Sequence, residues 1–179
     1  MNSKKDQDNT LAWEVETNRW ARRNVLFSTI TSGDLTDFPE LTEQDLKIFF
    51  TGSYQMSQAV SYLAEMMNKD GTITLQYVKI TPNIIKLQVR SRHINSKTYR
   101  CFVDYQPDKN KISGISRYCC DSANGRHTVG CCSHIAAIIY YYLSYARYLA
   151  KIIRSAEILS RLFINEKVNA VVNEDSDED

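Results

Sequence analysis

The stretch CCDSANGRHTVGCCSH, residues 119–134, holds four of the five cysteines and two of the three histidines of the chain. The cysteines fall into two clusters, which are separated by a polar loop that contains glycine. Thiolate sulfur and imidazole nitrogen are the ligands that zinc prefers in proteins, usually four of them in a tetrahedron. A tetrahedral metal site is therefore the first hypothesis for this stretch.

The two clusters are not equally clear as corners of such a site. Cys132 and His134 are separated by one residue, Ser133, at the start of a helical pattern, which suits a shared ion. In the first cluster Cys119 and Cys120 are adjacent, and adjacent residues of a strand point to opposite faces. One of those two is therefore expected to pack in the core, and the same argument applies to Cys131 beside Cys132.

The sequence before the clusters predicts an α+β fold. Within residues 41–71, LTEQDLKIFF has Thr42 as an N-cap and SYQMSQAVSYLAEMMNKDG repeats apolar residues at helical spacing, so two short helices are expected. From residue 72 the apolar period changes to two. The segments TITLQYV, IIKLQVRSRH, TYRCFVDY and KISGISRYC then predict a small antiparallel sheet.

The remaining segments flank this core. An apolar stripe that starts at Ile135 predicts a C-terminal helix packed on the sheet, with an extension over residues 151–172. Residues 1–40 are expected to be a partly ordered lead-in. Residues 173–179 form an acidic tail that has nothing apolar to bury and should be disordered.

Composition limits the class of protein. The 179 residues are 43% hydrophobic and 24% charged, which is typical of a soluble globular protein. The first residues lack the apolar core of a secretory signal, and the longest apolar run has nine residues, whereas a membrane span needs about 20. We therefore expect an intracellular protein with no membrane contact, whose clustered cysteines bind metal rather than form disulfides.

The cysteine pattern resembles the SWIM-type zinc finger, whose signature is Cys-x-Cys, a loop, and Cys-x-His on a ββα unit. The match runs through Cys120, Ser122 in the place of the second cysteine, Cys132 and His134. The flanking segments GRHTVGCCSHIAAIIYYYLSYAR and SRHINSKTYRCFVDY are similar to the SWIM segment near the C-terminus of proteins derived from DDE-type transposases. The resemblance covers about residues 35–150, and within it residues 72–150 would form the zinc finger domain with its preceding strands.

The resemblance implies bound Zn²⁺ and a role in DNA binding or protein interaction, in a non-catalytic and nuclear fragment of a transposase-derived protein. It implies Cys120, Cys132 and His134 as ligands. Ser122 is a poor zinc ligand. The fourth position would therefore be filled by a neighbouring residue or by water, or else the site would bind zinc weakly. The candidates are Cys119 first, then Cys131 or His127, whereas Cys101 is expected to be a core residue. No glutamate lies in the loop to act as a catalytic base, so we expect neither an enzyme nor a small-molecule substrate.

Several basic residues are candidates for contacts with nucleic acid. Thirteen Lys or Arg stand against three acids between residues 79 and 154. Lys86, Arg90 and Arg92 alternate along one strand face, where they could contact phosphates. Arg100, Arg117 and Arg126 are expected near the loop. The alternatives are an ordinary solvated face, or a protein-interaction module that uses the tyrosines of residues 140–148, with or without a metal.

Overall fold

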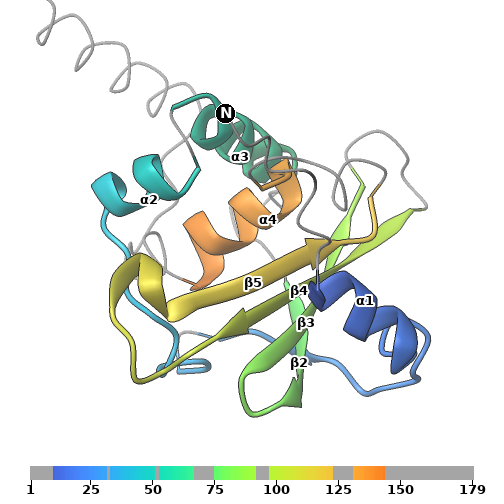
Figure 1. Ribbon diagram of the computed structural model, residues 1–179. Helices are drawn as coiled ribbons and strands as arrows, with labels where there is room; N and C mark the ends of the chain where they lie inside the picture. The colour runs from blue at the N-terminus through green and yellow to red at the C-terminus, as the bar shows by residue number, and fades with distance from the viewer. Residues whose placement is uncertain are drawn as a thin grey trace, which may run out of the picture.

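The chain forms a five-stranded antiparallel sheet with helices on both faces (Figure 1). The computed structural model describes residues 10–31, 33–50, 53–66, 75–91, 97–122 and 131–143. The helices are α1 (Thr10–Thr17), α2 (Glu43–Phe49), α3 (Ser53–Met66), the 3₁₀-helix η1 (Lys111–Gly114), α4 (Ser133–Ala137) and the π-helix η2 (Ile138–Leu143). The strands are β1 (Ser28–Thr29), β2 (Gln76–Thr81), β3 (Ile84–Arg90), β4 (Thr98–Tyr105) and β5 (Ile115–Cys120).

The sheet is a simple meander. Its order is β1-β2-β3-β4-β5, and every neighbouring pair is antiparallel. This confirms the small antiparallel sheet predicted from the period of two. Ile85, Leu87 and Val89 share the face of β3 that the alternation assigned to them, and all three are buried in the main core.

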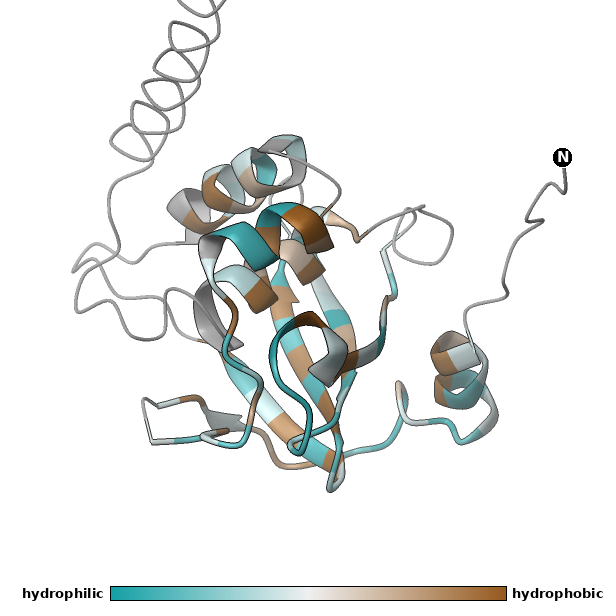
Figure 2. Cartoon of the chain, turned by 60° about the vertical axis from the view of Figure 1, so that its left-hand side comes forward, coloured by the Kyte–Doolittle hydropathy of each residue, from teal (hydrophilic) through white to brown (hydrophobic). Residues whose placement is uncertain are grey.

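Helices α2, α3 and α4 cover that inner face (Figures 1 and 2). The two short helices expected within residues 41–71 are therefore confirmed. Helix α2 begins where Thr42 and Asp45 form a capping box: the Thr42 hydroxyl accepts from the Asp45 amide, and the Asp45 carboxylate accepts from the Thr42 amide. Residues 135–140 are buried throughout, because α4 packs against both α3 and β5.

The outer face is covered by α1 and the segment after it. A second apolar cluster lies there, made of Leu11, Val15, Ile84, Phe102 and Cys119. The same cover buries the side chain of Lys86, which is only 2% exposed. Its ammonium donates to the carbonyl oxygens of Trp20 (2.9 Å) and Ala21 (3.4 Å). The expectation that Lys86 belongs to a solvated, phosphate-binding face is therefore wrong.

Three boundaries differ from the sequence prediction. The lead-in of residues 1–40 contains α1 and the edge strand β1. The last strand begins at Ile115 rather than at Lys111, because Lys111 has a positive φ of 57° and starts a 3₁₀-helix. The helix after His134 changes from α to π geometry at Ile138, and its predicted continuation beyond residue 143 lies outside the described residues.

The predicted extension at 151–172 and the acidic tail at 173–179 also lie outside the described residues. Among the helices that the structure does describe, none has the length and apolar character needed to cross a membrane.

Candidate metal centre

Three potential ligand atoms meet where β5 ends and α4 begins. The sulfur atoms of Cys120 and Cys132 and a ring nitrogen of His134 all lie within 4.8 Å of one another. Cys120 is the last residue of β5, Cys132 is the N-cap of α4, and His134 is in its first turn. Two thiols and an imidazole form a donor set that suits zinc and other thiophilic metals. The structure thus brings together the three residues on which the metal hypothesis most depended.

The ring of His134 is held between two tyrosines. Tyr62 of α3 contacts the ring edge-on at 4.9 Å between centroids, and Tyr99 of β4 contacts it at 4.5 Å in a tilted arrangement. The Tyr62 hydroxyl donates to the carbonyl oxygen of Arg90, which fixes its own position. In this orientation His134 Nδ1 lies 3.7 Å from Cys120 Sγ. The two aromatic contacts therefore aim Nδ1 at the thiol.

The Cys120 thiol also accepts a backbone hydrogen bond. The amide of Ser122 donates to Cys120 Sγ at 3.4 Å. The backbone of Ile135 and His134 acts to lower the pKa of Cys132, although its contact with Cys120 and its burial raise that pKa overall. Such donors stabilise negative sulfur and commonly surround metal-bound thiolates.

A third thiol, that of Cys101, lies opposite Cys120 in the β4–β5 pair and is fully buried in the same core. The neighbouring thiols of Cys101 and Cys132 lower the pKa of Cys120, although burial opposes them. Contact with Cys120, together with burial, raises the pKa of Cys132. Burial, followed by the contact with Cys120, raises the pKa of Cys101 well above its usual value.

The turn after Cys120 is fixed by an ion pair. Asp121 accepts the backbone N–H of Arg100 at 2.8 Å and its Nε at 2.6 Å, and the Asp121 amide donates to the Arg100 carbonyl at 3.1 Å. Arg100 Nη1 also donates to the carbonyl of Ala21 at 2.8 Å. This clamp (Asp121 with Arg100) closes the end of the β4–β5 pair beside Cys120. Sequence reasoning counted Asp121 only as an acid, because its partner is on the neighbouring strand.

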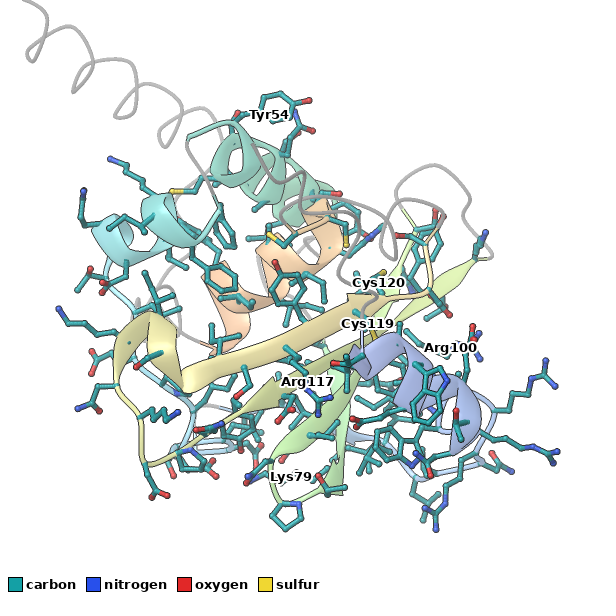
Figure 3. The ribbon with its side chains drawn as sticks, viewed as in Figure 1. Tyr54, Lys79, Arg100, Arg117, Cys119 and Cys120 are labelled. Carbon is teal, nitrogen blue, oxygen red and sulfur yellow. The ribbon has the colours of Figure 1, made fainter. Side chains whose placement is uncertain are left out.

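The structure does not bring Cys119 to the group. Cys119 lies on the outer face of the sheet with the α1 cluster, whereas Cys120 lies on the inner face, as Figure 3 shows for the two labelled side chains. The alternation along β5 therefore separates them, and the expected local twist that would let Cys119 reach the ion does not occur. We do not retain Cys119 as the fourth ligand.

The other two candidates for the fourth ligand are Cys131 and His127. Cys131 is fully buried in the main core, and burial raises its pKa to about 12. His127 lies outside the described residues. Ser122 contacts Cys120 through its backbone amide, whereas its hydroxyl oxygen is buried and makes no hydrogen bond.

Two of the arginines suggested for nucleic-acid contacts are engaged within the chain. Arg117 pairs with Glu14 of α1 at 2.5 Å and with Asp104 of β4 at 2.7 Å. Arg100 belongs to the clamp described above, and Figure 3 shows both guanidinium groups on the side of the sheet that α1 covers. Arg90 is exposed at the end of β3. Arg92 and Arg126 lie outside the described residues.

No family model, no curated protein and no solved structure matches the chain.

Proposed function

We propose that this protein is a SWIM-type, zinc-supported interaction module without catalytic activity, from a transposase-derived protein. The observation that carries the proposal is the meeting of Cys120, Cys132 and His134 within 4.8 Å. This order of donors, thiol at a strand end and Cys-x-His entering a helix, is the one that the resemblance implies. Zinc is the preferred ion because it accepts mixed sulfur and nitrogen ligands in a tetrahedron.

The zinc would act as a structural link. One side of the group belongs to β5 and the other to the start of α4, and residues 121–132 connect these two elements in the chain. A bound ion would therefore join the sheet to the buried helix α4. Metal binding of this kind contributes directly to folding stability, because the unfolded chain has no preformed site.

The charges on the described surface favour a protein partner over DNA. DNA binding depends on cations that are free to neutralise phosphates. Lys86 is buried, and Arg100 and Arg117 are paired with carboxylates of the same chain. Of the five arginines suggested for DNA contacts, Arg90 is the exposed one among the residues that the structure describes.

Elemental analysis of protein purified without chelator tests the zinc site. We expect about one zinc per chain in the wild type and in Cys131→Ala, and none in Cys132→Ala. Cys131 is the matched control, because it is the neighbouring, fully buried cysteine outside the group. A wild type without zinc, or equal zinc in Cys132→Ala, would reject the site.

A labelled DNA duplex tests the partner class by fluorescence anisotropy at two salt concentrations. If the partner is a protein, the zinc-loaded chain should show no steeply salt-dependent binding. Tight binding that weakens strongly with salt and is reduced in Arg90→Ala would favour the DNA-binding role instead.

A further inference from the structure

We propose that Cys101 of β4 is the fourth zinc ligand, in place of the cysteine that Ser122 replaces. The site would then hold three thiolates and one imidazole, from Cys101, Cys120, Cys132 and His134. This inference rests on the proposed function, since it assumes that the group binds zinc.

The strand register places Cys101 beside the group. Cys101 and Cys120 are directly opposite each other in the antiparallel pair of β4 and β5. Directly opposite residues have their side chains on the same face, with Cβ atoms about 4.5–5.5 Å apart. Both residues are buried in the main core, with Cys101 0% and Cys120 1% exposed. Cys101 is thus the cross-strand neighbour of one proposed ligand, on the same face of the sheet.

The alternatives fail for separate reasons. Cys119 is on the opposite face of the sheet, in the cluster under α1. Cys131 has no partner in the β4–β5 pair, and its sulfur is outside the set of atoms that lie within 4.8 Å of one another. Ser122 offers a neutral hydroxyl, which is a much weaker zinc ligand than a thiolate. Among the residues described, Cys101 is therefore the remaining thiol, and it is directly opposite a proposed ligand.

The chemistry of ligation is proton exchange. Zinc requires its sulfur ligands as thiolates, so binding releases the protons of these thiols. Cys101 is opposite Cys120 in the strand pair, but its sulfur is outside the set of atoms that lie within 4.8 Å of one another. The Cys101 sulfur would therefore have to move toward the ion. The resulting site would connect β4 as well as β5 to α4.

X-ray absorption at the zinc edge counts the sulfur ligands, because Zn–S bonds of about 2.3 Å and Zn–N bonds of about 2.0–2.1 Å are resolved from each other. We expect three sulfurs and one nitrogen in the wild type and in the control Cys119→Ala, which removes a buried thiol from the other face. Cys101→Ala should retain two sulfurs and bind zinc more than about 100-fold more weakly, beyond the 10–100-fold loss typical of groups that only support a ligand.

The double variant Cys101→Ala/Ser122→Cys keeps the test valid if Cys101→Ala alone fails to hold zinc. It supplies a thiol at the position that the resemblance predicts, and should restore three sulfurs and most of the affinity. Failure of this double variant to regain zinc would overturn the inference.

Two further results would also overturn it: two sulfurs in the wild type, or three sulfurs in Cys101→Ala. Zinc with two sulfurs leaves the proposed function intact, whereas absence of zinc from the wild type rejects that function and the inference with it.

Discussion

The clamp between Asp121 and Arg100 should stabilise the fold independently of any metal. In Asp121→Ala two hydrogen bonds to a carboxylate are lost, at 2.8 Å and 2.6 Å, and the side chain that is removed is only 16% exposed. Hydrogen bonds to charged groups contribute about 1.5–3 kcal/mol each. The Arg100 side chain is 37% exposed, so its ion pair is screened and contributes about 0.5–1 kcal/mol. We expect a loss of about 2–4 kcal/mol in the free energy of unfolding.

Urea denaturation in the presence of a chelator measures this loss without a contribution from metal. Asp121→Asn is the matched control, because its amide oxygen can still accept the Arg100 N–H. It should lose about 1–2 kcal/mol less than Asp121→Ala. An alanine variant within about 0.5 kcal/mol of the wild type would refute the clamp, since that is the range of ordinary surface substitutions. Equal losses in the two variants would assign the effect to the ion pair rather than to the backbone bond.

Three further outcomes follow from the fold. Gly114→Ala should lose about 1–3 kcal/mol in urea denaturation, because a methyl group there would overlap the side chain of Pro39, whereas Gly33→Ala has open space. Lys86→Met, which keeps the buried stem but leaves the carbonyl oxygen of Trp20 without this donor, should lose about 1–3 kcal/mol in the same assay. Burial raises the pKa of Asp37. Hydrogen bonds, of which the one from Lys79 has the largest effect, outweigh burial and hold that pKa below 3.8. The stabilisation of the fold by ionised Asp37 is thus present above pH 3.8 and is lost as pH falls through the lowered pKa. A difference in stability between the wild type and Asp37→Asn that persists unchanged at lower pH would contradict this.

The sequence predicted those elements that carry a local signal. Along β3 the apolar residues of the inner face alternate with polar ones, and α2 begins at a recognisable capping box. Helix α1 was missed because Leu11 and Val15 are the two residues it buries, and they contact the far side of the sheet. Lys86 was misread for the same reason, since its alternation marked a polar face but not the carbonyl oxygens that cover it.

The candidate site was predictable as far as its spacing is local. Cys132 and His134 are two positions apart, and a strand end followed by a loop could be expected to bring Cys120 to them. The contact between Cys101 and Cys120 depends on strand register, which no local pattern supplies. For the same reason Cys101 could be recognised as buried but not as a neighbour of the site.

The adjacent cysteines at the end of β5 show how one strand can serve two sides of the molecule. Cys119 packs with Leu11 and Phe102 under α1, whereas Cys120 faces the thiols of the inner cluster. The two residues should therefore have separable effects. Loss of Cys119 should weaken the packing of α1 without changing the metal ligands, and loss of Cys120 should remove the sulfur that every other donor in the cluster contacts. The alternation along β5 determines which cysteine faces the site, and the clamp lies directly after this pair, between the ends of β4 and β5.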